Sequence, residues 1–256
     1  MRLIRYVTAT DAPRYGWIHE DKIGPIEGTP FGDYRRLEAE IPMHTARLLA
    51  PVQPSKIICV GRNYAEHARE QNVEVPEIPL LFMKPPTAVI GPDEAIVLPP
   101  QSKQVEHEGE LAVVIGRTGR WIQANEALEY VMGYTVANDV TARDLQRRDG
   151  QWTRGKGFDT FCPIGPWIET ELDPTDVLVQ TRVNGEMRQM ASTREMMFPV
   201  EQLIAFVSSV MTLLPGDLIL TGTPAGIGPL LAGDTIEVSV EGIGSLKNPV
   251  TTPLGR

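Results

Sequence analysis

Acidic residues alternate with other residues directly before an apolar segment near the middle of the chain. Glu106, Glu108 and Glu110 occupy every second position and lead into the β-branched stretch 111–115. Side chains of a β-strand alternate between its two faces, so this spacing predicts three carboxylates on one face. Carboxylates at the mouth of a core strand repel one another and lose hydration, so a cation or a proton must compensate them. The alternative interpretation is a polar strand end in solvent.

A further carboxylate ends a second apolar segment. Asp139 follows the stretch 134–138 and would be well placed for ligation at the end of a strand. A set of three carboxylates without nearby thiolates or histidine pairs forms an oxygen-rich site, which suits Mg²⁺ or Mn²⁺ better than zinc, with Ca²⁺ as a further candidate. Taken by itself, Asp139 also fits the N-cap of a helix formed by the segment that follows.

Two other positions could carry acid–base or electrostatic chemistry. His67 and Glu70 are three positions apart in a segment that follows the predicted strand 56–60. On a helical turn they are neighbours, and the glutamate could orient an imidazole base, although a solvated helix with an incidental histidine explains the same spacing. Lys156 stands between two glycines in the aromatic stretch 152–161. Its ammonium could meet a substrate carboxylate or an oxyanion, and the alternative is a surface loop lysine.

The composition limits the classes of function. The chain has 256 residues and a formal net charge of -9, which opposes binding to nucleic acid. An acidic protein that handles anionic metabolites needs local positive charge, which a divalent cation would supply. No apolar run is long enough to span a bilayer, and the N-terminus lacks the pattern of a secretory signal. We therefore expect a cytoplasmic protein without a membrane partner, in which Cys59 and Cys162 are core residues.

Two prolines divide the chain. Pro51 and Pro54 separate a small N-terminal β-containing domain, residues 1–50, from a larger domain, residues 51–256. Short apolar runs predict strands at 2–7, 15–19, 57–60, 80–83, 96–98, 111–115, 134–137, 177–183, 218–220 and 236–240. The pattern is mainly β with some α, without the regular strand–helix alternation of a doubly wound sheet.

Turn and helix signals complete this pattern. Asn184-Gly185 tolerates the positive φ of a type I′ turn and predicts a hairpin after 177–183. Helical spacing occurs at 127–132, closed by Gly133, and at 200–214, closed by Pro215-Gly216. The turn at 221–228 matches neither a phosphate loop nor a dinucleotide fingerprint, so we expect no nucleotide.

Taken together and in this order, the segments resemble the fumarylacetoacetate hydrolase superfamily from Lys56 to the end of the chain. The ordered set is far more specific than any single motif. The first fifty residues show no likeness specific enough to use. The matching pieces are Gly61-Arg62-Asn63-Tyr64 with His67, Met83-Lys84-Pro85, His107-Glu108-Gly109-Glu110-Leu111, Asn138-Asp139-Val140-Thr141-Ala142-Arg143-Asp144, Lys156-Gly157-Phe158-Asp159 and Leu220-Thr221-Gly222-Thr223-Pro224.

The resemblance implies a mixed β-sandwich or β-roll fold, a homodimer, and Mg²⁺ or Mn²⁺ held by Glu108, Glu110 and Asp139. It places Glu106 outside the set of ligands. It also implies that His67 and Glu70 activate water from a short lid segment and that Lys156 is the partner of an oxyanion or carboxylate. The positions that the resemblance places beside the substrate are Arg62, Tyr64, Arg143, Gln146 and Thr223.

The activity implied by the resemblance is hydrolysis of a carbon–carbon bond in acylpyruvate-type 2,4-dioxo acids such as fumarylpyruvate or acetylpyruvate. The cation would bind the 1-carboxylate and 2-oxo oxygens and take up the charge of the pyruvate enolate. Decarboxylation of oxaloacetate could share this site. The alternative is a 2-hydroxyhepta-2,4-diene-1,7-dioate isomerase or 5-carboxymethyl-2-oxo-hex-3-ene-1,7-dioate decarboxylase. A third hypothesis, from a different functional class, is a noncatalytic metal-binding or scaffold protein.

Overall fold

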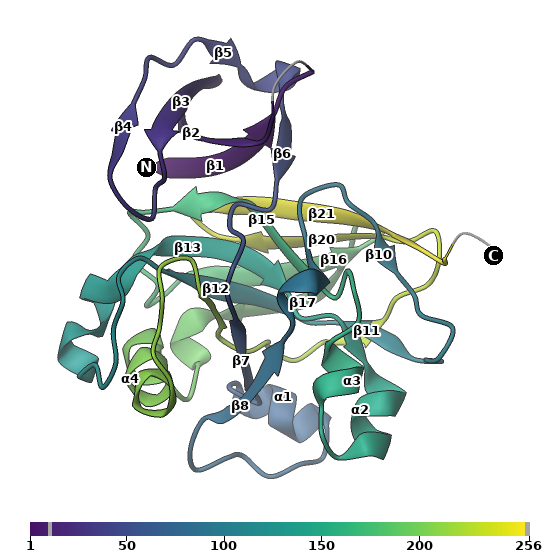
Figure 1. Ribbon diagram of the computed structural model, residues 1–256. Coiled ribbons are helices and arrows are strands. Elements are labelled where there is room, and N and C mark those ends of the chain that lie inside the picture. The colour runs from purple at the N-terminus through teal and green to yellow at the C-terminus, as the bar shows by residue number, and fades with distance from the viewer. Residues whose placement is uncertain (10–11, 254–256) are drawn as a thin grey trace.

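The computed structural model describes residues 1–9 and 12–253 and is mostly β, with short helices (Figure 1). The N-terminal strands, drawn in purple, stand at one end of the molecule. β1 pairs with β2 and with β6, and it also pairs with β15, so one sheet runs from this segment into the rest of the chain. The division at residue 50 stays a prediction. The N-terminal elements are β1 (Arg2–Val7), β2 (Arg14–His19), β3 (Lys22–Gly28), β4 (Tyr34–Arg36), β5 (Ile41–Pro42), the 3-10 helix η1 (Met43–Thr45) and β6 (Arg47–Leu49).

The same sheet continues through the strands that contain or adjoin the three carboxylates predicted as metal ligands. Its order from the N-terminal segment onward is β15-β13-β12-β18-β7-β8. β9 pairs with β15 at its side. The bounds are β7 (Ile57–Gly61), β8 (Leu80–Lys84), β9 (Val89–Ile90), β12 (Gly109–Ile115), β13 (Val131–Asn138), β15 (Cys162–Glu169) and β18 (Leu218–Leu220).

A second sheet covers one face of the first. Its order is β10-β21-β20-β16-β17, and a small third sheet has the order β14-β11-β19. The bounds are β10 (Ile96–Val97), β11 (Val105–His107), β14 (Thr141–Ala142), β16 (Leu178–Val183), β17 (Glu186–Ser192), β19 (Gly228–Pro229), β20 (Thr235–Val240) and β21 (Gly244–Thr251). This layered arrangement confirms the mixed β fold that the sequence predicts.

Strand β12 is buried on both faces. Leu111 and Val113 pack in the core cluster that includes β16, β20 and helix α4, whereas Ala112 and Val114 pack in a second cluster with β7 and β18. The strand therefore reads as a continuous apolar run rather than as an alternating one. A carboxylate at its beginning enters a region from which water is already excluded.

The helices are short, and α1, α2 and α3 gather at the end opposite the N-terminal strands (Figure 1). Among the described residues, no helix is long and apolar enough to cross a membrane. The bounds are α1 (Ala65–Glu70), η2 (Pro86–Ala88), η3 (Ala124–Tyr130), α2 (Arg143–Asp149), α3 (Thr153–Lys156), η4 (Thr193–Glu195) and α4 (Val200–Val210).

The structure confirms the hairpin and corrects both helix predictions. Asn184 and Gly185 have φ of 52° and 82° between β16 and β17. The helix expected at 127–132 is wrong, because the 3-10 helix η3 ends at Tyr130 and residues from Val131 onward form β13. The helix expected at 200–214 ends at Val210, after which Leu213 forms a bridge with Gly119. In both cases apolar residues continue at helical spacing beyond the observed end of the helix, because the segment that follows also packs against the core.

Candidate metal and acid–base site

The strand that was expected to carry three alternating glutamates is interrupted. Glu106 lies in β11, which belongs to the small third sheet, whereas Glu110 lies in β12 of the large sheet, and Glu108 connects them. The prediction of one continuous strand is therefore wrong, because the chain changes sheets at Glu108. The solvated strand end is wrong as well, since the three glutamates are buried.

Strand pairing brings Asp139 to Glu108. In the antiparallel pair of β12 and β13, Gly109 stands opposite Asn138. The next residues outward are then Glu108 and Asp139, and the Asp139 N–H donates to the Glu108 carbonyl at 2.8 Å. The Asn138 side chain accepts from the Glu108 N–H at 3.0 Å. Asp139 caps no helix, because α2 begins at Arg143 with Ala142 as its N-cap.

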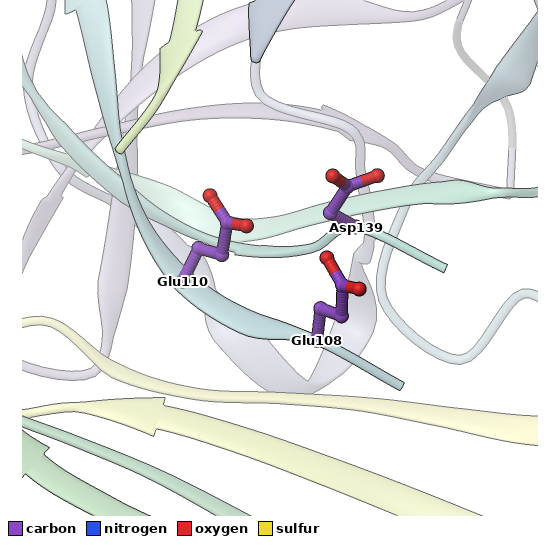
Figure 2. Close-up of side chains that lie close together, drawn as sticks. All are labelled: Glu108, Glu110 and Asp139. Carbon is purple, nitrogen blue, oxygen red and sulfur yellow. The ribbon is translucent and has the colours of Figure 1, made fainter. Parts of the chain in front are cut away.

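The three predicted ligands converge (Figure 2). One carboxylate oxygen from each of Glu108, Glu110 and Asp139 lies within 4.8 Å of the other two. Asp139 Oδ1 has no well-aligned hydrogen-bond donor among the described residues, although Lys84 Nζ lies 2.5 Å away. The Glu110 carboxylate accepts the Gly222 N–H at 2.7 Å. Oxygen donors that converge with spare lone pairs fit a hard divalent cation such as Mg²⁺ or Mn²⁺.

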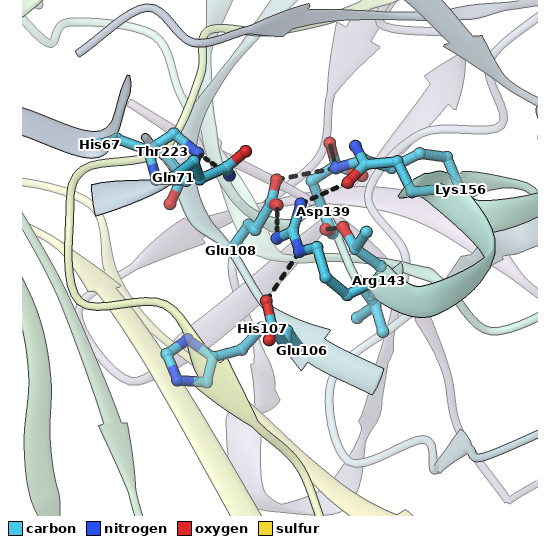
Figure 3. A network of polar contacts seen from close by, with 12 residues as sticks. His67, Gln71, Glu106, His107, Glu108, Asp139, Arg143, Lys156 and Thr223 are labelled. Atoms are coloured by element: carbon cyan, nitrogen blue, oxygen red, sulfur yellow. Dashed lines mark hydrogen bonds and ion pairs between the residues drawn. The ribbon is translucent and has the colours of Figure 1, made fainter. Parts of the chain in front are cut away.

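Cationic side chains surround the cluster. Lys156 Nζ donates to Glu108 at 2.8 Å and to Asp139 at 2.7 Å. Arg143 donates to Glu106 at 2.7 Å and also to Glu108 (Figure 3). Lys156 and Arg143 are each 1% exposed, so the surface-lysine interpretation of Lys156 is wrong. Buried charges of this density persist only when they are paired.

The unequal surroundings of the carboxylates separate their pKa values. Burial would raise the pKa of Glu108, but Lys156 and Arg143 outweigh it and hold the pKa of this carboxyl below its ordinary value. Burial, together with the charges of Asp139 and Glu108, raises the pKa of Glu110 well above its usual range. Glu110 is thus the carboxylate that most requires a further positive charge.

His67 lies beside the cluster on α1. Its side chain is buried, which excludes the solvated-helix interpretation. His67 Nδ1 lies 3.4 Å from Glu70, and Nε2 lies 2.8 Å from the amide nitrogen of Gln71. An amide nitrogen can only donate, so Nε2 accepts and the imidazole proton is on Nδ1, toward Glu70. Burial lowers the pKa of His67, which favours the neutral imidazole.

The turn after β18 closes the site from the other side. Gly222 has a φ of 100°, and a Cβ on it would lie 2.7 Å from the Asn63 Cβ. Thr223 Oγ1 donates to the carbonyl of Gly109 at 2.9 Å. Gln189 Nε2 donates to Thr223 at 2.8 Å. The turn is thereby fixed to the strand that carries Glu110.

A small cavity joins most of the predicted residues. Its free volume of about 10 Å³ holds about one water molecule, so a substrate can enter only if part of the wall moves. Tyr64 does not line it: its side chain is buried, and burial raises its pKa. Glu70 does not line the cavity, but its carboxylate lies 3.4 Å from Nδ1 of His67, which does. The predicted residues in the wall are Arg62, His67, Glu108, Glu110, Arg143, Gln146, Lys156 and Thr223.

Sequence reasoning missed five residues of the cavity wall and one buried counter-ion. The wall residues that were missed are Val60, Gly61, Gln71, Phe82 and Trp152. Lys84 is fully buried and donates to the carbonyls of Val140 and Lys156 at 3.0 and 2.6 Å. Lys84 could have been found from the sequence because it lies in one of the matching motifs, and Gln71 because it is one helical turn after His67. Phe82 could not, because its sequence context indicates only an apolar strand.

The fold and the acidic cluster together define the class of protein. Residues 56–251 match the family described as fumarylacetoacetate (FAA) hydrolase, C-terminal, and residues 1–51 match a family described as Rv2993c-like, N-terminal. The chain belongs to the fumarylacetoacetate hydrolase family, whose members are enzymes.

Individual relatives have different activities. The chain is 47% identical over 231 residues to the mitochondrial oxaloacetate tautomerase Fahd2a of Rattus norvegicus, covering 84% of this chain and 74% of that protein. It is similar to the crystal structure of 5-carboxymethyl-2-hydroxymuconate delta-isomerase from Mycobacterium smegmatis, with a TM-score of 0.93, 49% identity and coverage of 98% and 100%. Maleylpyruvate hydrolase from Sphingobium sp. SYK-6, in complex with manganese (II) ion and pyruvate, has a TM-score of 0.82, 32% identity and coverage of 99% and 100%.

Proposed function

We propose that this protein is a divalent-metal-dependent hydrolase that cleaves a carbon–carbon bond in acylpyruvate-type 2,4-dioxo acids. The observation that carries the proposal is that a neutral buried histidine, a buried lysine and two carboxylates, Glu108 and Glu110, line one cavity, and that Asp139 converges with these two carboxylates. The manganese and pyruvate bound by the Sphingobium hydrolase support this assignment. Glu108, Glu110 and Asp139 would hold Mg²⁺ or Mn²⁺. When bound, the cation supplies positive charge that stabilises the negative charge developing as the bond breaks.

The side chains of the chain itself supply the remaining steps. Once the Gln71 amide no longer donates to His67 Nε2, this nitrogen takes a proton from water. The proton on Nδ1 faces Glu70. The water then adds to the distal carbonyl of the substrate. Lys156 is within reach of the same cavity, and its ammonium donates to the oxyanion that forms. The oxyanion then collapses, the bond between the distal carbonyl carbon and the neighbouring CH2 carbon breaks, and the distal part leaves as a carboxylic acid. The CH2 carbon keeps the electron pair and takes the proton back from the imidazolium, which releases pyruvate.

Entry of the substrate requires the α1 segment to move. Both Glu70 oxygens accept from the Gly226 N–H, at 3.1 and 3.2 Å. This pair of contacts holds α1 against the turn after β18. Opening of this six-residue helix would break these contacts and expose His67 and Ala68, which are the two side chains that it buries.

A second activity, proton transfer without hydrolysis, is supported by the relatives. The isomerase and the oxaloacetate tautomerase are 49% and 47% identical to this chain, whereas the hydrolase is 32% identical. Isomerisation of a 2-hydroxydienoate, or decarboxylation of oxaloacetate or a 5-carboxymethyl-2-oxo-hex-3-ene-1,7-dioate, would use the same charge stabilisation without an attacking water. We further propose that the protein works as a cytoplasmic homodimer.

The two activities can be separated with the purified protein. Pyruvate release from acetylpyruvate and from fumarylpyruvate is measured with Mn²⁺ and with excess EDTA. We expect release that depends on the metal. If both acylpyruvates stay intact while the ultraviolet band of a 2-hydroxydienoate shifts, the hydrolase proposal is wrong and the isomerase proposal replaces it.

A further inference from the structure

Arg62 occupies a conformation that few residues other than glycine adopt. Its φ is 58°, in the left-handed region, directly after β7. A long side chain in this region costs free energy, and such positions persist where the surrounding structure enforces them. Arg62 is half-buried and lines the same cavity as the carboxylates.

The neighbours of Arg62 fix its backbone on both sides. Gly61 pairs with Leu80 in the sheet. Asn63, which is fully buried, donates to the carbonyls of Thr221 and Phe198 at 2.7 and 3.0 Å. Its side-chain oxygen accepts the Phe198 N–H at 2.9 Å. The residue is therefore held in place independently of the α1 helix that follows.

Arg62 is the cavity cation without an acidic partner. Lys156 is paired with Glu108 and Asp139, and Arg143 is paired with Glu106 and Glu108. Within the described part of the chain, no carboxylate forms an ion pair with Arg62, and its Nε is buried without a hydrogen-bond partner. A buried, unsatisfied guanidinium nitrogen is costly, and an anionic ligand would satisfy it.

Aromatic side chains shape the space around this guanidinium. Its Cζ lies 5.7 Å from the centre of the Trp152 ring. Trp152 in turn packs edge-on against Phe82, with ring centres 5.2 Å apart. A Cβ on Gly61 would lie 2.7 Å from Trp152, so the indole rests directly on the backbone that precedes Arg62. The aromatic wall excludes water and strengthens a charge-assisted hydrogen bond made beside it.

We propose that Arg62 recognises a second carboxylate on the substrate, so that the enzyme prefers dicarboxylic 2-oxo acids over monocarboxylic ones. The proposal rests on the proposed function in one respect, because it assumes that the 2-oxo acid end of the substrate lies at Glu108, Glu110 and Asp139. The opposite end of the substrate then carries the carboxylate that serves as the anionic partner of Arg62. Arg62 is a specificity residue in this scheme and takes no part in the proton transfers.

The test uses two ligands of equal length that contain no bond for the enzyme to hydrolyse. 2-Oxoglutarate and 2-oxovalerate differ by a carboxylate in place of a methyl group. Their dissociation constants are measured by calorimetry with the Mn²⁺-loaded protein. We expect 2-oxoglutarate to bind about 10- to 100-fold more tightly, as a charge-assisted hydrogen bond implies.

Variants assign the preference to one side chain. Arg62→Gln should reduce the ratio of the two constants to about threefold or less, and Arg62→Lys, which keeps the charge, should restore part of it. Arg69→Gln is the matched control, because Arg69 lies seven positions away, is exposed and pairs with Glu66. It should keep the wild-type ratio.

The outcomes separate this proposal from the proposed hydrolysis. Equal binding of both ligands by the wild-type protein, absence of binding by either, or an unchanged ratio in a folded Arg62→Gln variant would each overturn the role of Arg62. The wild-type measurement decides the first two even if the variant does not fold. A preserved preference in a protein that leaves acylpyruvates intact would contradict only the hydrolase.

Discussion

The carboxylate cluster and the α1 segment are built in opposite ways. Glu108, Glu110 and Asp139 stand at the ends of β12 and β13, in a register fixed by the strand pairing and by Asn138. α1 is a helix of six residues, and its Glu70 is tied to Gly226. The three carboxylates proposed as metal ligands are thus pre-organised by the sheet, whereas the proposed acid–base group lies on a short helix outside it.

The largest expected effect is the loss of turnover in Glu110→Gln, which tests whether Glu110 is a metal ligand rather than a counter-ion of the buried cations. Glu110→Gln should lower Mn²⁺-dependent turnover by about 10³-fold or more, because it removes an anionic ligand. The metal-free protein should keep its stability, since the pKa of Glu110 is raised and its main polar contact is the Gly222 N–H. Both are measured on one preparation, by turnover assay and by urea unfolding.

Glu108→Gln is the matched comparison within the cluster. It leaves Lys156 and Arg143 buried with one counter-ion fewer. The metal-free protein should lose about 3–5 kcal/mol of unfolding free energy, as for other broken buried ion pairs. Equal stability of the two variants would contradict the proposed division between Glu110 and Glu108.

Removal of the histidine tests the moving region. His67→Ala should lower hydrolysis by about 10²- to 10⁴-fold. Mn²⁺ affinity should change little, because the carboxylates are held by strands rather than by α1. Decarboxylation of oxaloacetate, which needs no attacking water, should be affected less. Unchanged hydrolysis would remove His67 from the mechanism.

Much of the site could be predicted from the sequence, for physical reasons that differ between residues. Glu108, Glu110 and Asp139 adjoin recognisable apolar segments, which marked them as candidates, and the resemblance to the family selected these three as the ligand set and excluded Glu106. The change of sheet at Glu108 could not be predicted, because it depends on β14 and β19 pairing with β11. The true ends of η3 and α4 were missed because buried apolar spacing continues past them.

The turn after β18 connects the two regions, and Gly222 is its critical residue. Gly222→Ala should destabilise the protein by about 1–3 kcal/mol, because the added Cβ would meet Asn63 and a φ of 100° suits only glycine. Thermal unfolding measures this loss. Gly185→Ala, at a hairpin turn with φ of 82° and open space around it, is the control for backbone strain alone. Equal losses would show that the contact with Asn63 is unimportant.

The smallest effect concerns pH. Burial lowers the pKa of His67 from its ordinary value of 6.5, so the imidazole stays neutral to lower pH than a solvent-exposed histidine. Hydrolysis should therefore be constant through neutral pH and fall by about tenfold per unit below the pKa of His67, with the midpoint under 6.5. A pH profile of kcat/KM measures it. A midpoint above 6.5 would contradict the buried, neutral base.

The most direct test of the account is where manganese binds. Crystals of the wild-type protein soaked in Mn²⁺ are examined by anomalous scattering, in parallel with Glu110→Gln crystals. We expect one strong peak coordinated by Glu108, Glu110 and Asp139 in the wild type and a peak that is lost or much weaker in the variant. Manganese elsewhere, or these three side chains pointing apart with no ion between them, would contradict the proposed metal site.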